Sequence, residues 1–199
     1  MMRGLLSLTT ARSFDIVTLT EAKAHLRVDT TDEDTLIDAL IDAAHEVVER
    51  EANLVLAAST WLLKLPDWPS NFYSLRPGPV SSVTSIKYYD VDGTLQTLSS
   101  SYYRLAGGGE FGSRLEWVEN LTLPSLSSRD SVDVVRIEYV QGYANAAAVP
   151  AGLKQAALLI IGHYFENRED VITGTIVAKI PRAAESLISL FGERNAYAS

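Results

Sequence analysis

The chain has 199 residues, of which 47% are hydrophobic and 21% charged, a composition typical of a folded protein of one or two domains. Its net charge of −8 is uneven: residues 1–60 hold 5 basic and 11 acidic side chains, residues 61–150 hold 7 and 9, and residues 151–199 hold 5 and 5. The acidic first third argues against a reader of duplex DNA, and the absence of cysteine excludes disulfides and thiolate metal sites.

The first elements in chain order are helical. Residues 1–17 are expected to form a flexible arm, too short in apolar sequence for a secretory signal. Thr18 and Glu21 have the spacing of a capping box, which predicts a short helix to about Arg27. Acidic residues then open a second, long amphipathic helix that ends near Asn53. We expect residues 18–58 to form an N-terminal helical part.

The middle of the chain changes from a helical to a strand-like period. Residues 59–145 contain short β-rich runs bounded by Pro, Gly, Ser and Asp, and Asp92-Gly93 is a strong hairpin signal because a type I′ turn needs positive φ at both central residues. We therefore predict an α+β fold, in which a bundle of about four helices carries an inserted small antiparallel β-sheet.

The last part returns to helices. Residues 150–170 are expected to form a helix that is apolar on nearly every side, so protein must enclose it, and its charged and polar residues break the run well short of a membrane span. The segment 171–179 is expected to be a loop, and Pro181 to begin a final helix. Residues 146–199 are expected to form a C-terminal helical part that packs with 18–58.

Motifs for catalysis or metal binding are weak. Gly107, Gly109 and Gly112 match a dinucleotide fingerprint but precede a strand pattern rather than a helix, so they indicate a hairpin loop. The three histidines lie on separate predicted helices without a second ligand at metal spacing. No catalytic residue, cofactor or metal is predicted, although a carboxylate-dependent hydrolase and a generic ligand-binding module remain alternatives.

Three segments, in this order, resemble the phage head-tail connector family, also called adaptors or head-completion proteins. They are residues 19–28 with the acidic turn and long helix that follow, residues 75–93 with a Pro-rich strand entry and the Asp-Gly hairpin, and residues 149–169. Together the resemblance covers most of residues 18–191, and the order and spacing of the three segments make it more specific than any one of them.

The resemblance implies a structural role without enzymatic activity. Such proteins form a ring, typically of about 12 copies, under the portal protein of a tailed bacteriophage or a gene transfer agent. The ring extends the DNA channel, lets DNA pass without specific binding, and docks a neck, stopper or tail-completion protein. The resemblance implies that the protein lies in the virion neck after assembly and in the host cytoplasm before it. It implies no membrane partner.

Three sets of residues follow as expected contact sites. The family's C-terminal segment commonly reaches the portal, which corresponds here to Ile180, Pro181, Leu187, Ile188, Leu190, Phe191, Arg194 and Tyr197. The exposed end of the apolar helix is expected to contact the neighbouring subunit through Tyr164, Glu166, Arg168 and Glu169. The acidic charge of the first third motivates the hypothesis that the channel is lined by Asp32, Glu33, Asp34, Asp38 and Asp42.

Overall fold

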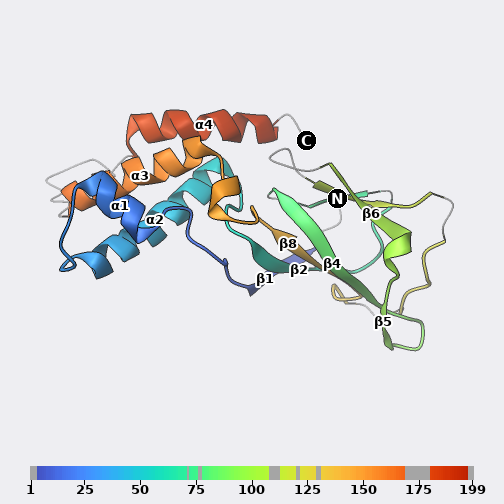
Figure 1. The fold of residues 1–199 in the computed structure, drawn as a ribbon. Helices are drawn as coiled ribbons and strands as arrows, with labels where there is room; N and C mark the ends of the chain where they lie inside the picture. The colour runs from blue at the N-terminus through green and yellow to red at the C-terminus, as the bar shows by residue number, and fades with distance from the viewer. Residues whose placement is uncertain are drawn as a thin grey trace, which may run out of the picture. The chain divides into compact units, whose positions relative to one another are not determined.

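The structure is a computed structural model that describes residues 4–70, 72–75, 78–107, 113–119, 122–128, 131–168 and 180–196 (Figure 1). The chain forms two compact units. The first comprises residues 1–13 and 58–143, and the second comprises residues 14–57 and 144–199. Of the helices in the described ranges, none combines the length and the apolar character that crossing a membrane requires.

The first unit contains two antiparallel sheets. The larger has the strand order β1-β2-β8-β4-β5, and the smaller has the order β3-β7-β6. A one-turn 3-10 helix, η1 (Ser100–Tyr102), precedes β6. The strands are β1 (Leu5–Thr10), β2 (Ser59–Leu65), β3 (Phe72–Leu75), β4 (Val80–Tyr89), β5 (Leu95–Thr97), β6 (Tyr103–Gly107), β7 (Ser113–Trp117) and β8 (Val135–Gln141).

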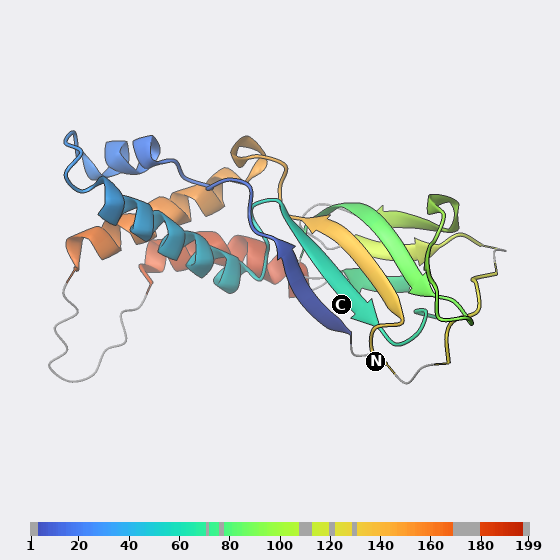
Figure 2. The same cartoon turned by 90° about the horizontal axis from the view of Figure 1, so that it is seen from below.

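Strand β8 organises this unit because it pairs with both β2 and β4. Its residues alternate between buried and half-buried positions, as expected for a strand whose side chains point to opposite faces. One hydrophobic core joins the two sheets, with Ile137 of β8 and Ile86 of β4 from the larger sheet and Leu115 of β7 from the smaller one. Figure 2 shows β1 beside β2 at the edge of the larger sheet.

The second unit is helical. Its elements are α1 (Leu19–Leu26), α2 (Asp34–Ala52), the one-turn η3 (Ala146–Ala148), α3 (Ala151–Glu166) and α4 (Arg182–Ala196). The core is formed by one face each of α2, α3 and α4, and its fully or nearly fully buried residues include Ile37, Ile41, Val48, Leu153, Ile160, Ile161, Ala184 and Ile188. The start of α3 lies beside the late part of α4, where a Cβ on Gly152 would lie 3.2 Å from the Phe191 ring, as expected for an antiparallel pair.

Several predictions from the sequence are confirmed. The fold is α+β with four α-helices in the described ranges, and Thr18 and Glu21 form the predicted capping box. Helix α2 ends as predicted at Asn53, whose φ of 51° lies in the left-handed region that asparagine tolerates better than most residues. The predicted hairpin between β4 and β5 is present, but its turn is not the type I′ turn expected at Asp92-Gly93: Gly93 has a φ of 78°, whereas Asp92 does not have a positive φ, and the Gly93 N–H donates to the Asp90 carbonyl.

Two predictions need correction. The β region is not a small insert, because it contains a five-stranded and a three-stranded sheet. The expectation of a flexible arm is wrong for Leu5–Thr10, which form strand β1 and pair with β2. Both errors have the same physical origin, since strand pairing joins residues that are far apart in the chain and local sequence patterns do not report it.

Candidate assembly surfaces

Helix α1 is fixed to the rest of the helical unit by its first turn. The Thr18 backbone N–H donates to Glu21 Oε2 at 2.8 Å, and the Glu21 N–H donates back to Thr18 Oγ1 at 3.2 Å. The first of these bonds is the main reason that the pKa of Glu21 is lowered. Lys154 of α3 lies 3.4 Å from the same carboxylate, so this charge also connects α1 with α3.

The five acids predicted to line a channel divide into two groups. Glu33 and Asp34 are half-buried, and each has a basic partner within the unit, Arg168 for Glu33 and Lys23 of α1 for Asp34. Asp32, Asp38 and Asp42 are exposed. Asp38 and Asp42 lie four residues apart on α2 and therefore share one helix face. Asp38 and Asp42 are therefore acids that α2 presents on its surface.

The end of α3 is held by a contact that local sequence did not predict. The Arg168 guanidinium lies 2.6 Å from Glu33 Oε1 and stacks 4.4 Å from the centroid of the Phe165 ring. Two sequence-predicted residues with different expected roles, the subunit-interface Arg168 and the channel acid Glu33, therefore bind each other. The predicted subunit contacts Tyr164 and Glu166 are half-buried and exposed, respectively, and Glu169 lies outside the described residues.

Helix α4 has an inner and an outer face. Ile188 is 3% exposed, whereas Leu190, two residues later, is 61% exposed. Leu187 and Phe191 are half-buried, as are Ile180 and Pro181 before the helix. The predicted portal residues thus include one core residue, Ile188, and one strongly exposed apolar residue, Leu190. Arg194 lies on the helix, and Tyr197 is outside the described residues.

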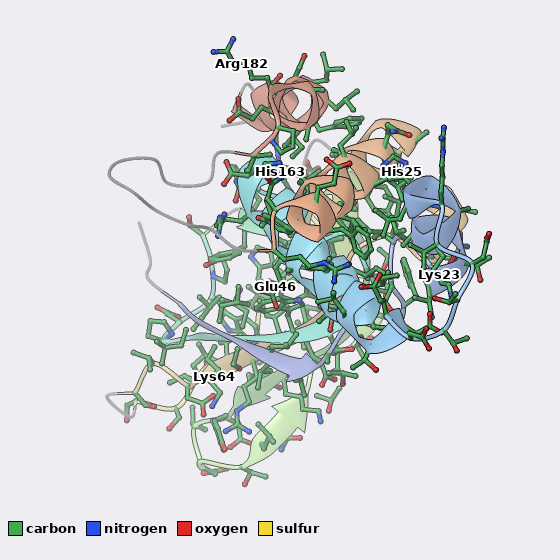
Figure 3. The ribbon with its side chains drawn as sticks, turned by 90° about the vertical axis from the view of Figure 1, so that its left-hand side faces the viewer. Lys23, His25, Glu46, Lys64, His163 and Arg182 are labelled. Atoms are coloured by element: carbon green, nitrogen blue, oxygen red, sulfur yellow. The ribbon has the colours of Figure 1, made fainter. Side chains whose placement is uncertain are left out.

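Histidine and aromatic side chains serve mostly as packing groups. His45 is fully buried, with its Nε2 atom 3.1 Å from Glu49 Oε1, and His25 of α1 lies against Gly162 of α3. Figure 3 labels His25 and His163 on the helices that carry them. Trp68 packs against Trp117 and donates its indole N–H to the Pro124 carbonyl.

Phe72 of β3 is an aromatic side chain on the surface. It is 52% exposed, and the Arg114 guanidinium of β7 lies 5.3 Å from its ring centroid. Within the described ranges, no three His, Cys, Asp or Glu side chains converge as a candidate metal site. The surfaces of this chain therefore offer exposed apolar and acidic side chains suited to contact with other macromolecules.

Comparison with known protein families decides the relationship. The model of a family described as "Head completion protein" matches residues 15–179, which is most of the chain. The chain belongs to the head completion protein family. The matched range includes the capping box of α1, the acidic start of α2, both sheets except β1, and the whole of α3.

Solved structures contain chains with the same fold as this head completion protein. A chain from the "Neck of empty GTA particle computed with C6 symmetry" and one from the "Virion of native gene transfer agent (GTA) particle" each superpose with a TM-score of 0.74 at 24% identity, covering 94% of both chains. A chain from the "Neck of native GTA particle computed with C12 symmetry" superposes with a TM-score of 0.71 at 22% identity. No curated protein sequence matches the chain.

Proposed function

We propose that this head completion protein is a structural adaptor that forms a ring under the portal of a tailed phage or a phage-like particle. The observation that carries the proposal is the family match over residues 15–179. The fold supports it, since chains of the same architecture come from structures described as GTA necks with C6 and C12 symmetry. In this role the protein has no enzymatic activity, extends the DNA channel and docks the next neck or tail protein.

Helix α4 is the part we assign to the portal. Its inner face, with Ala184 and Ile188, belongs to the core of the helical unit, so the portal contact falls on the outer face around Leu190. An exposed leucine is suited to such a contact, because burying its side chain against a partner contributes roughly 1.5–3 kcal/mol. In the same proposal Tyr164 and Glu166 at the end of α3 contact the neighbouring subunit.

Three exposed acids, Asp32 just before α2 and Asp38 and Asp42 on it, are assigned to the channel. Asp32, Asp38 and Asp42 are exposed, whereas Glu33 and Asp34 are half-buried. Basic side chains would neutralise DNA phosphates and retain the DNA, so an acidic wall favours sliding without binding. The proposal therefore restricts the five sequence-predicted acids to the three that are exposed.

The test is assembly on the purified portal of the same particle. Mass photometry of portal mixed with this protein is expected to give a complex that is heavier by a whole ring, about 12 copies, while the protein alone stays smaller. A Leu190→Glu variant is expected to abolish the complex, and Val91→Glu, an equally accessible change in the sheet unit, to preserve it. A protein that leaves the mass of the portal unchanged would refute the adaptor role.

A further inference from the structure

The three-stranded sheet has one face toward the core of the sheet unit and one face away from it. Leu115 of β7 is fully buried in that core, so its neighbours along the strand, Arg114 and Glu116, point to the opposite, outer face. The strand register adds the residues directly opposite them on β3 and β6. This outer face therefore consists of Phe72, Ser74, Arg104, Ala106, Arg114 and Glu116.

The two arginines of this outer face differ in their partners. Arg104 Nη2 lies 2.9 Å from Glu116 Oε2, so these two charges neutralise each other. The Arg114 guanidinium instead lies 5.3 Å from the centroid of the Phe72 ring, and no carboxylate of the described residues pairs with it. A stacked guanidinium keeps its planar set of N–H donors available for a carboxylate. The outer face thus offers an exposed aromatic ring and a positive charge without a carboxylate partner among the described residues.

The end of α3 offers an aromatic ring and the opposite charge. Tyr164 is half-buried, and Glu166, the last residue of the helix, is exposed. The nearby Arg168 binds Glu33 at 2.6 Å, and Glu166 has no basic partner within the described ranges. A carboxylate at the end of a helix lies at the negative end of the helix dipole, so Glu166 does not stabilise α3 itself.

The net charges of the two units favour a contact between unlike units. Residues 1–13 and 58–143, the sheet unit, hold 9 basic and 9 acidic side chains, which gives a net charge of 0. Residues 14–57 and 144–199, the helical unit, hold 8 and 16, which gives −8. Like charges across a contact oppose binding, so two helical units repel each other, whereas a helical unit and a sheet unit do not.

We propose that the outer face of the three-stranded sheet in one copy receives the end of α3 from the neighbouring copy, with Glu166 paired to Arg114 and Tyr164 against Phe72. This inference rests on the proposed ring and names the surface that the end of α3 meets there. A ring contact is heterologous, which means that two different surfaces of the same chain must be complementary. An aromatic ring with a carboxylate and an aromatic ring with a guanidinium are such a pair.

Native mass spectrometry of the purified portal with a limiting amount of this protein tests the contact. Each bound copy adds 21.8 kDa. Contacts between copies make binding cooperative, so the wild-type protein is expected to give empty and fully occupied portals with few intermediates. Arg114→Glu places a carboxylate opposite Glu166 and is expected to give portals of intermediate occupancy. Lys87→Glu, the same charge change at an exposed position of the larger sheet, is the matched control and is expected to fill portals as the wild type does.

A charge exchange tests whether these two residues meet. Glu166→Arg alone is expected to give intermediate occupancy, and the double variant that combines it with Arg114→Glu is expected to restore cooperative filling, because the ion pair forms again with its charges exchanged. Circular dichroism checks that each variant is folded. Arg114→Gln removes the charge with a smaller change of shape and is expected to act in the same direction if Arg114→Glu does not fold.

The outcomes separate this contact from the adaptor role. A double variant that fills portals no more cooperatively than either single variant would overturn the inference, as would cooperative filling by Arg114→Glu or independent filling by the wild type. Complete rings of Arg114→Glu that fail to recruit the next neck protein would overturn it too, because the outer face would then bind a different partner. A wild-type protein that adds no mass to the portal would refute the adaptor role itself.

Discussion

The two faces of α4 make a prediction that separates folding from assembly. Ile188 is 3% exposed in the core of the helical unit, and replacing it with alanine removes buried carbon atoms and leaves a cavity, at a cost of about 2–5 kcal/mol in the free energy of unfolding. Leu190 is 61% exposed, so Leu190→Ala should change that free energy by no more than about 0.5 kcal/mol. Both variants make a similar truncation on the same helix and differ in burial.

Urea unfolding followed by helical circular dichroism measures the first effect, and titration of the portal measures the second. Leu190→Ala should weaken portal binding by about tenfold per subunit, because roughly 1.4 kcal/mol of apolar burial is lost at the contact. Equal destabilisation by the two variants would refute the packing of α4 described above. Unchanged portal affinity of Leu190→Ala would refute the assignment of the outer face.

Three further predictions concern charge and capping. Thr18→Ala removes the cap of α1 and should lower the free energy of unfolding by about 1 kcal/mol in chemical denaturation. The pKa of Asp133 is lowered, first by its hydrogen bond from Arg136, so the ionised carboxylate stabilises the sheet unit at any pH above the pKa that Asp133 has in the unfolded chain. Acid titration should show this stabilisation disappearing as the pH falls through the pKa of Asp133 in the folded protein. Asp133→Asn should remove the stabilisation. Replacing Asp38 and Asp42 with lysine should slow DNA release from assembled particles, and unchanged release kinetics would count against the channel assignment.

The sequence predicted those features that depend on neighbouring residues. The capping box of Thr18 and Glu21 spans one helical turn, and the hairpin that contains Gly93 joins Tyr89 to Leu95 over a few residues, so the local chain determines both. The sequence also predicted that α3 is apolar on nearly every side; Leu153 and Ile160 are buried in the core of the helical unit, whereas Leu158 and Leu159 are half-buried.

The missed features depend on residues distant in the chain. Strand β1 forms because Leu5–Leu8 pair with Trp61–Lys64 of β2. Arg168 forms an ion pair with Glu33, which lies directly before α2 in the chain. The hydrophobic periodicity of the sequence identifies neither the strand that pairs with β1 nor the acid that pairs with Arg168. The same reason limits the site predictions, since burial divides the expected portal residues between Ile188 in the core and Leu190 on the surface, and sequence spacing alone ranked them equally.

Electron cryo-microscopy of the intact particle tests the adaptor role most directly. The account predicts a ring of this chain in contact with the underside of the portal, with α4 at the portal contact and DNA or an open channel along the ring axis. Particles from a strain that lacks the gene should lose that ring and every component below it. A neck in which another protein occupies this position, or in which this chain is absent, would contradict the account.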